Sequence, residues 1–247
     1  MLDTLIIGGG QSGLAAGQKL QEAGLRFMIL EAQDQVAGSW PQYYNSLELF
    51  SPARYSGLPG LPFPGDPQRY PKRDEVTQYL SLYARHFSLP IHTGQRLVNA
   101  QKIHGGWRVQ SAGGDVWEAQ TLIAATGSFS KPHQPDFPGQ QEYLATGGKI
   151  IHSAAYRRPQ DYSGKRVLVI GAGNSAMQIS YELAQHTYTT LTSHKRVQFV
   201  PQRIAGHDIH AWLKLSAYHN LPLGSWFGIS IPVQVLDTGR YRKALKQ

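Results

Sequence analysis

The sequence of 247 residues contains no cysteine. Disulfide bonds, thiolate metal ligands and catalytic thiols are therefore excluded, and so is a reductase that passes electrons through a cysteine pair. The net charge is +8, but no run of Lys and Arg exceeds two residues. Without a basic stripe or a motif that reads bases, no nucleic-acid partner is expected. No metal site is predicted.

The sequence also lacks an uninterrupted apolar segment. Residues 215–236 contain no Asp, Glu, Lys or Arg, but two prolines and two glycines interrupt them. We therefore expect no stable membrane insertion, and a loop beside a pocket is the simpler interpretation; contact with a membrane surface is the alternative. The N-terminus shows no basic leader, so a cytoplasmic location is expected.

What the chain does contain is a glycine-rich turn near its start. The apolar run Leu5–Ile7 leads into Gly8–Gly13, which reads Gly-x-Gly-x-x-Gly, and a helical pattern, a second apolar run and Glu31 follow. Such glycines allow a pyrophosphate to approach the backbone at a helix N-terminus, and an acid about 20 residues on binds ribose hydroxyls. This order predicts a dinucleotide site.

The same device recurs in the second half. The run Val167–Ile170 precedes Gly171–Ala176, which reads Gly-x-Gly-x-x-Ala, and a helical pattern and the run Tyr188–Thr192 follow. The position that holds an acid in the first unit now begins the basic cluster His194–Arg196. Bases there suit the 2′-phosphate of NADP, whereas an acid suits the free ribose of FAD or NAD. A solvated strand end is the alternative. Two different nucleotides imply electron transfer, for which FAD and NADPH are the natural pair.

Further motifs surround these units. They are Gly-Ser-Trp at 38–40, Tyr-x-x-Leu-x-x-Phe-x-Pro at 44–52, Ala-Thr-Gly at 125–127 and Gly-x-x-x-His-x-x-x-Tyr at 148–156. Together with the two glycine turns, they resemble the flavin-containing monooxygenase superfamily, particularly its bacterial monooxygenase-like flavoproteins, over essentially the whole chain. The resemblance implies hydride transfer from NADPH to FAD, then reaction with oxygen and a small-molecule substrate.

The resemblance also implies which residues hold the cofactors. The FAD contacts would be Gly8, Gly9, Gly10, Gln11, Ser12, Gly13, Glu31, Gly38, Ser39, Trp40 and Leu97. The NADPH contacts would be Gly171, Gly173, Asn174, Ser175, His194, Lys195 and Arg196. Thr126 and Gly127 would form the hinge between the cofactor domains.

The chain departs from the superfamily at two positions. Thr146 replaces the phenylalanine that opens the histidine motif, so His152 is a candidate for coordinating domain movement, with simple packing as the alternative. Phe50 replaces an asparagine, which removes an amide donor beside the flavin and favours an NADPH:acceptor reductase or oxidase without oxygenation as the alternative function. No catalytic side chain is assigned. The candidates for the flavin–substrate pocket are Tyr44, Phe50, Ser51, Arg54 and His152.

The expected fold class is α/β, with two Rossmann-like, doubly wound, three-layer nucleotide-binding domains. We place an FAD-binding domain at 1–127, with a small antiparallel β excursion at 98–122, where apolar and polar residues alternate around a Gly-Gly turn. A connector with the histidine motif follows at 128–164, and an incomplete NADP-binding domain at 165–247.

The second domain shows too few strand signals. Residues 199–203 are expected to form a loop, helices are expected at 74–87 and 209–217, and no apolar strand is expected to lead into 237–239. The chain therefore resembles its family without the C-terminal part, and a non-catalytic nucleotide-binding fragment is a further alternative. The apolar tail makes a homodimer possible.

Overall fold

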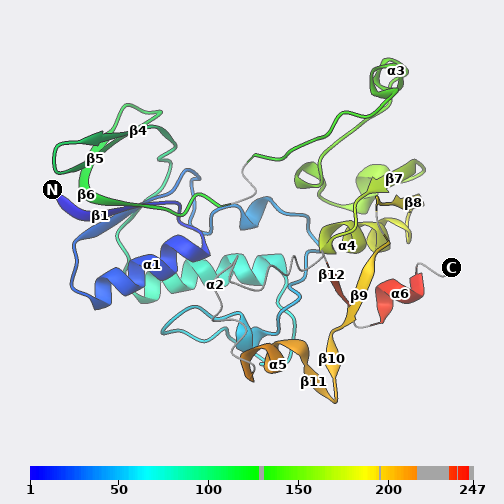
Figure 1. Cartoon of the computed structure of the whole chain (residues 1–247), viewed down its shortest axis with the longest axis horizontal. Coiled ribbons are helices and arrows are strands. Elements are labelled where there is room, and N and C mark those ends of the chain that lie inside the picture. Colours follow the sequence, from blue (N-terminus) through cyan, green and yellow to red (C-terminus); the bar gives the residue numbers. More distant parts are fainter. Residues whose placement is uncertain (128–130, 195, 216–233, 238, 245–247) are drawn as a thin grey trace.

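The computed structural model describes residues 1–127, 131–194, 196–215, 234–237 and 239–244 (Figure 1). It contains two α/β units, one from the N-terminal half and one from the C-terminal half, which lie side by side and are joined by a segment along the upper side of the view (Figure 1). The interpretation of 215–236 as a pocket loop falls almost entirely outside the described residues.

The first unit is built on a six-stranded sheet with the order β3-β2-β1-β6-β5-β4. Its strands are β1 (Leu2–Ile7), β2 (Phe27–Leu30), β3 (Ile91–His92), β4 (Leu97–Ile103), β5 (Gly106–Ser111) and β6 (Val116–Ala124). β3, β2, β1 and β6 run parallel, whereas β6, β5 and β4 are antiparallel. The long strand β6 thus belongs both to the parallel part of the sheet and to the predicted antiparallel excursion.

Alternation along the strands separates the two faces of this sheet. Ile6 and Ile29 are fully buried on the face covered by α1 (Gln11–Glu22) and α2 (Arg73–His86). Leu5 and Leu30 face the opposite way and pack against Val109 of β5. Because side chains in a strand point alternately to the two faces, one short apolar run supplies two cores. The predicted α/β class and the helix expected at 74–87 are confirmed.

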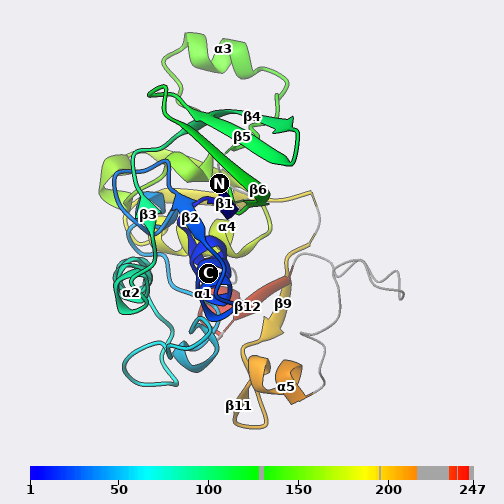
Figure 2. The same ribbon diagram turned by 90° about the vertical axis from the view of Figure 1, so that its left-hand side faces the viewer.

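The remaining described parts of the first unit and the segment between the units form short turns and one small helix. The single-turn helices are η1 (Trp40–Gln42), η2 (Ala53–Tyr55), η3 (Ser153–Ala155) and η4 (Pro159–Tyr162). The connector also carries α3 (Gln140–Ala145), which projects from the upper edge of the molecule in both ribbon views (Figures 1 and 2).

The second unit has narrower sheets. Its elements are β7 (Arg166–Ile170), α4 (Asn174–Leu183), β8 (Tyr188–Thr192), β9 (Gln198–Pro201), β10 (Arg203–Ile204), β11 (His207–Asp208), α5 (Ile209–Leu215), β12 (Gln234–Asp237) and α6 (Arg240–Ala244). β7 pairs in parallel with β8, β9 pairs in parallel with β12, and β10 forms a hairpin with β11. Within the described residues, no sheet of this unit is wider than two strands. No helix described here combines the length and apolar character needed to cross a membrane.

Two sequence expectations about this unit are wrong. Residues 198–201 form strand β9 rather than a loop, and strand β12 does lead up to Asp237. Each strand is only four residues long, but they pair with each other, and Val235 is fully buried beside Met177 of α4 and Tyr241 of α6. Burial against residues distant in sequence stabilises strands whose local pattern is too short to predict.

The two units touch through α4. Gln178 accepts a hydrogen bond from the Glu48 amide (3.3 Å) and donates one to the Glu48 carbonyl (2.9 Å). Ser46 and Tyr156 both donate to Glu182, at 2.6 and 3.0 Å. Arg240 of α6 adds an ion pair with the Glu48 carboxylate at 3.0 Å. The segment at 44–48 is therefore held between the units.

A second contact between the units centres on a buried aspartate. Oδ2 of Asp208 accepts hydrogen bonds from the Tyr70 hydroxyl (2.7 Å) and from Gln202 (2.9 Å), while Oδ1 accepts from the His210 amide (2.9 Å). Gln202 also donates to the carbonyl of Phe50. Burial opposes ionisation of Asp208, but these hydrogen bonds together lower its pKa below the ordinary value.

We expect this aspartate to contribute pH-dependent stability. Because its folded-state pKa is lowered, its contribution is present above the unfolded-state pKa of about 3.9 and is lost as the pH falls through the folded-state value. Asp208→Asn should lower the free energy of unfolding by about 2 kcal/mol at pH 7, since hydrogen bonds to a charged group are lost. Urea denaturation from pH 7 to pH 2.5 should show the difference between the two proteins shrinking below pH 4.

Asp115→Asn is the control, because Asp115 lies exposed in the turn between β5 and β6. It should change the unfolding free energy by less than about 0.5 kcal/mol. A difference between wild type and Asp208→Asn that stays constant across this pH range would contradict the assignment.

Candidate functional site

The first glycine turn lies at the carboxyl edge of the parallel strands. The Gly8 amide donates to the carbonyl of Leu30 (2.8 Å), and the Ala125 amide donates to that of Ile7 (2.8 Å). These bonds join Gly8 and Ala125, which follow β1 and β6, to the last residues of β2 and β1. Ligands of open α/β sheets bind outside this edge.

Three glycines of the turn differ in what a side chain would meet. A Cβ atom at Gly13 would lie 1.9 Å from the Gly8 carbonyl oxygen, and one at Gly8 would lie 2.3 Å from the Ala125 oxygen. At Gly10, by contrast, the nearest atom is the Gly38 Cα at 3.9 Å. Gly8 and Gly13 therefore allow helix and strand to approach, whereas Gly10 leaves open space in front of α1.

That open space faces an uncapped helix N-terminus. Gly10 is the N-cap residue of α1 and has no side chain to satisfy the first amides, which belong to Gln11, Ser12 and Gly13. The free N–H groups and the positive end of the helix dipole attract an anion. A pyrophosphate fits this cradle, because the space at Gly10 is open: the nearest atom to an added Cβ would be the Gly38 Cα at 3.9 Å.

Glu31 lies beside the turn, as predicted. Its side chain is buried, with Oε2 accepting from the Gly9 amide (2.6 Å) and Oε1 from the Gln33 amide (2.8 Å). A carboxylate offers about four acceptor positions, so two remain for the hydroxyls of a ribose. Leu97 begins β4 close by and packs against the core below Glu31 that contains Leu30.

The segment after Glu31 closes the other side of the cradle. The Ala37 amide donates to the Gly9 carbonyl (3.2 Å), and the Trp40 indole donates to the Gln11 side chain (2.6 Å). Ala37 is fully buried with φ of +116°, a strained conformation that its surroundings must impose. The structure thus brings Gly38, Ser39 and Trp40 against the glycine turn.

The predicted hinge residues follow β6 directly. A Cβ atom at Gly8 would lie 3.5 Å from the Thr126 Cα, so Thr126 touches the glycine turn. Gly127 adopts φ of +74°, which favours glycine, and it is the last described residue before the connector.

The second glycine turn repeats this arrangement in smaller form. The Gly171 amide donates to the Thr192 carbonyl (2.9 Å), which joins the ends of β7 and β8. Gly173 is the N-cap of α4, and Asn174 and Ser175 form its first turn. His194 and Arg196 are exposed in the residues that follow β8, while Lys195 lies outside the described residues.

The five pocket candidates do not gather in one place. Tyr44 is buried against α4, where it donates to Gln178 (3.0 Å) and hydrogen-bonds Ser175, and burial raises its pKa. His152 caps η3 by accepting from the Ala154 amide (3.1 Å). Both lie in or next to the packed contact between the units.

The other three candidates lie along the segment that reaches η2. The Phe50 ring is about half exposed, Ser51 contacts the Ser56 hydroxyl at 2.9 Å, and Arg54 is exposed. Phe50 and η2 are next to Asp208 and His210, which the sequence analysis did not identify. In the sequence, only the spacing Asp-Ile-His at 208–210 points to this pair. That spacing predicts nothing unless Tyr70 and Gln202 are known to contact Asp208. Among the described residues, no group of three or more His, Asp or Glu side chains could hold a metal ion.

Comparisons with known proteins agree with this geometry. A family model described as pyridine nucleotide-disulphide oxidoreductase matches residues 5–215. The chain is 35% identical over 234 residues to an uncharacterized CzcO-like oxidoreductase of Geobacillus kaustophilus, covering 95% of this chain and 66% of that protein. It is 35% identical over 206 residues to the indole-3-pyruvate monooxygenase YUCCA1 of Oryza sativa subsp. japonica, covering 82% and 50%.

A solved structure shows the same fold. The flavin-containing monooxygenase from Stenotrophomonas maltophilia matches with a TM-score of 0.77 and 32% identity, covering 95% of this chain and 71% of that one. The predicted resemblance to flavin-containing monooxygenases is confirmed. The chain spans only 66% and 50% of the lengths of the two curated relatives.

A methyl group at Gly10 tests the cradle directly. Gly10→Ala should lower the affinity for FAD at least about tenfold, because the methyl occupies the space that a pyrophosphate needs. Its effect on folding should be below about 0.5 kcal/mol, since no atom lies closer than 3.9 Å to the added carbon. Quenching of FAD fluorescence and urea denaturation measure the two quantities.

Gly13→Ala is the matched variant, because it adds the same methyl group at a glycine where there is no room for it. Its Cβ atom would collide with the Gly8 carbonyl at 1.9 Å, so the unfolding free energy should fall by about 1–3 kcal/mol. If Gly10→Ala bound FAD as tightly as wild type, the pyrophosphate would not lie at this turn.

Proposed function

Because the chain belongs to the pyridine nucleotide-disulphide oxidoreductase family, we propose that it is a flavin-dependent oxidoreductase that binds FAD at the first glycine turn and NADPH at the second. The name of this family includes disulphide chemistry, but the chain has no cysteine to carry it. FAD, when bound, supplies the two-electron redox chemistry. The protein contributes binding, orientation and the exclusion of water.

The observation that carries the proposal is the difference in charge at equivalent strand ends. After β2 the chain places the buried carboxylate of Glu31, and after β8 it places the exposed His194 and Arg196. A carboxylate accepts hydrogen bonds from free ribose hydroxyls and would repel a 2′-phosphate, whereas a guanidinium binds that phosphate. The first turn thus selects FAD and the second NADPH.

Each residue of the two turns would bind a particular group of FAD or NADPH. The amides of Gln11 and Ser12 would receive the FAD pyrophosphate, and Glu31 would hold its ribose. The amides of Asn174 and Ser175 would receive the NADPH pyrophosphate, with Arg196 on the 2′-phosphate. These roles extend the geometry of the two turns to their ligands.

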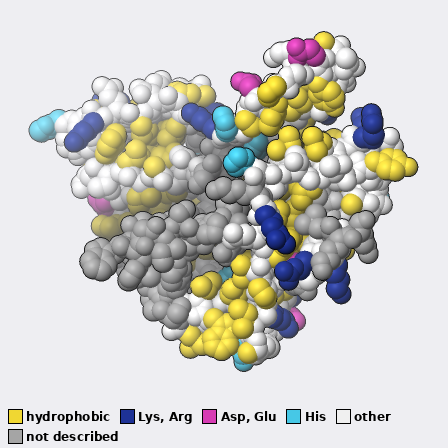
Figure 3. Space-filling view, turned by 45° about the vertical axis from the view of Figure 1, so that its right-hand side comes forward, with side chains coloured by type: hydrophobic (Ala, Val, Ile, Leu, Met, Phe, Trp, Pro, Cys, Tyr) yellow, Lys and Arg dark blue, Asp and Glu magenta, His cyan; other side chains and the backbone are white. Residues whose placement is uncertain are grey.

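For the second half of the reaction, we propose that oxygen and a small molecule are the acceptors. The relative from rice is named for monooxygenation of indole-3-pyruvate, and the solved structure is a flavin-containing monooxygenase. In Figure 3, most Lys and Arg side chains on the visible face lie on its right-hand half, among apolar and uncharged groups.

The second candidate function is an NADPH oxidase or acceptor reductase that inserts no oxygen. Phe50 favours it, because its exposed ring offers no hydrogen bond to a bound intermediate or substrate. The two functions differ in stoichiometry. An oxidase releases one peroxide for each NADPH, whereas a monooxygenase releases one oxygenated product.

The experiment that tests the proposal is an anaerobic titration of the FAD-loaded chain with NADPH. The flavin absorbance near 450 nm should bleach with one equivalent of NADPH and return when air is admitted. A chain that binds FAD but is not bleached would instead be a nucleotide-binding fragment without turnover.

Arg196→Ala should raise the KM for NADPH about 10- to 100-fold and leave that for NADH unchanged, because a charge-assisted hydrogen bond to the 2′-phosphate is worth about 1.5–3 kcal/mol. Arg166→Ala is the control, since Arg166 is exposed at the opposite end of β7. Steady-state kinetics with both coenzymes provide the measurement. Equal losses for NADPH and NADH would remove the phosphate-binding role of Arg196.

A further inference from the structure

Asp208 and His210 form an oriented pair that the nucleotide sites do not use. Nδ1 of His210 lies 2.7 Å from Oδ1 of Asp208, and the two side chains are 18% and 3% exposed. The His210 amide donates to the same oxygen at 2.9 Å. The pair bridges the end of β11 and the first turn of α5.

The carboxylate of this pair is held from both sides. Tyr70 and Gln202 donate to Oδ2 of Asp208, which leaves Oδ1 for the imidazole. An ionised carboxylate only accepts hydrogen bonds, so Nδ1 of His210 must carry the proton in this contact. The other ring nitrogen, Nε2, is therefore the one that gains and loses a proton.

Two aromatic rings fix the plane of the imidazole. Phe50 stacks on it with ring centroids 6.2 Å apart and an interplanar angle of 21°, and Tyr55 does so at 6.0 Å and 23°. Both rings belong to the first unit, whereas His210 belongs to the second. Stacking holds the plane of the imidazole and Asp208 holds Nδ1. The orientation of Nε2 is therefore fixed.

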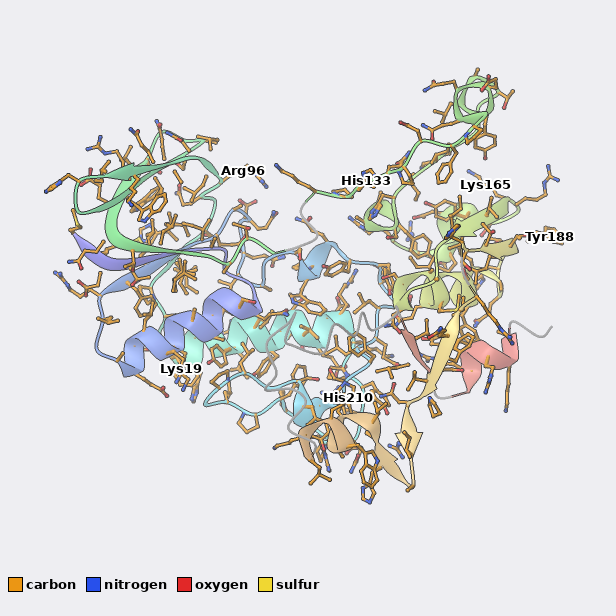
Figure 4. All side chains as sticks on the ribbon, viewed as in Figure 1. Lys19, Arg96, His133, Lys165, Tyr188 and His210 are labelled. Carbon is orange, nitrogen blue, oxygen red and sulfur yellow. The ribbon has the colours of Figure 1, made fainter. Side chains whose placement is uncertain are left out.

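The pair lies where the two units meet. Leu49 and Ala53 flank Phe50, and both pack into the core that also contains Trp40 and Ala125 at the carboxyl edge of the sheet. Figure 4 shows His210 pointing from α5 toward this segment, far from Lys165 and Tyr188 on the outer side of the second unit. The imidazole therefore reaches the first unit on the segment that continues from its nucleotide-binding edge.

The charged and titratable groups around the imidazole are few. Asp208 faces it from β11, Tyr55 from η2, and Tyr70 from the loop before α2, with Arg203 of β10 hydrogen-bonded to Tyr70. Burial, followed by the contact with Asp208, raises the pKa of Tyr70 to about 12. Asp208 stays ionised and Tyr70 stays neutral from pH 5 to 9, so neither of these two groups supplies a proton in that range.

We propose that His210 is the proton donor to the acceptor in the oxidoreductase reaction, and that Asp208 is its positioning residue. This inference rests on the proposed function. With oxygen as acceptor, two electrons and one proton come from the reduced flavin, and His210 supplies the second proton to give hydrogen peroxide. The Nε2–H bond of the imidazolium breaks, an O–H bond of the peroxide forms, and water then reprotonates the neutral ring.

A purely structural role makes different predictions. If the cluster only joins the units, its variants should change stability and leave the pH dependence of turnover as in wild type. If His210 donates a proton, oxidation of the reduced flavin by oxygen should slow as the pH rises and the ring becomes neutral. General acid catalysis of this kind is worth about 10²–10⁴-fold in rate.

The experiment compares His210→Gln with His207→Gln in the FAD-loaded chain. His207 lies three residues earlier at the start of β11 and makes an edge contact with Trp212, so it controls for loss of a nearby histidine. Stopped-flow measurement from pH 5.5 to 8.5 should show flavin reduction by NADPH unchanged in both variants. Reoxidation by oxygen should be at least about 100-fold slower at pH 6 in His210→Gln and independent of pH, while His207→Gln follows wild type.

A second readout needs no turnover. The ¹⁵N spectrum of the histidine-labelled chain should place the proton of neutral His210 on Nδ1 in wild type, and Asp208→Asn should distribute it over both nitrogens. This measurement also serves if His210→Gln does not fold. In that case the pH at which the His210 ring titrates must coincide with the midpoint of the wild-type reoxidation profile, and a mismatch overturns the proposal.

The outcomes separate this inference from the function on which it rests. If NADPH fails to bleach the wild-type flavin, the proposed function falls. If NADPH bleaches it but His210→Gln reoxidises with the wild-type rate and pH profile, only the role of His210 is overturned.

Discussion

The close approach of helix α1 to strand β1 positions everything else in the nucleotide site. The Cα of Gly13 lies so near the Gly8 carbonyl that an added Cβ would be 1.9 Å from its oxygen. This contact aims the N-terminus of α1 at the carboxyl edge of the sheet, where Glu31 accepts a hydrogen bond from Gly9. A cofactor bound there meets amides, a carboxylate and open space in one place.

The second unit uses the same geometry with the opposite charge. Its helix α4 begins after Gly173, but the strand next to it ends in bases rather than an acid. The helix also has a structural task, because Gln178 and Glu182 on it bind the segment at 44–48 of the first unit. The helix proposed to present its amides to NADPH therefore also holds the second unit against the first.

The sequence predicted these units because their signals are local. A run of four or five apolar residues, a glycine turn and an amphipathic helix together need no knowledge of distant partners. The strands β9 and β12 escaped prediction because each is stabilised by the other, more than 30 residues away in the chain. The same holds for Asp208, whose donors come from residues 70, 202 and 210. Tyr44, proposed for a pocket by resemblance, is buried against α4, and its burial depends on contacts that no motif encodes. The domain boundaries and the homodimer stay predictions.

The central claim is that charge at the strand ends assigns a different nucleotide to each turn. Equilibrium binding of 2′,5′-ADP and of 5′-AMP to the FAD-saturated chain tests it most directly, because the two ligands differ only by the 2′-phosphate. The account predicts that 2′,5′-ADP binds at least about tenfold more tightly and does not displace FAD. Equal affinities, or displacement of FAD by 2′,5′-ADP, would contradict it.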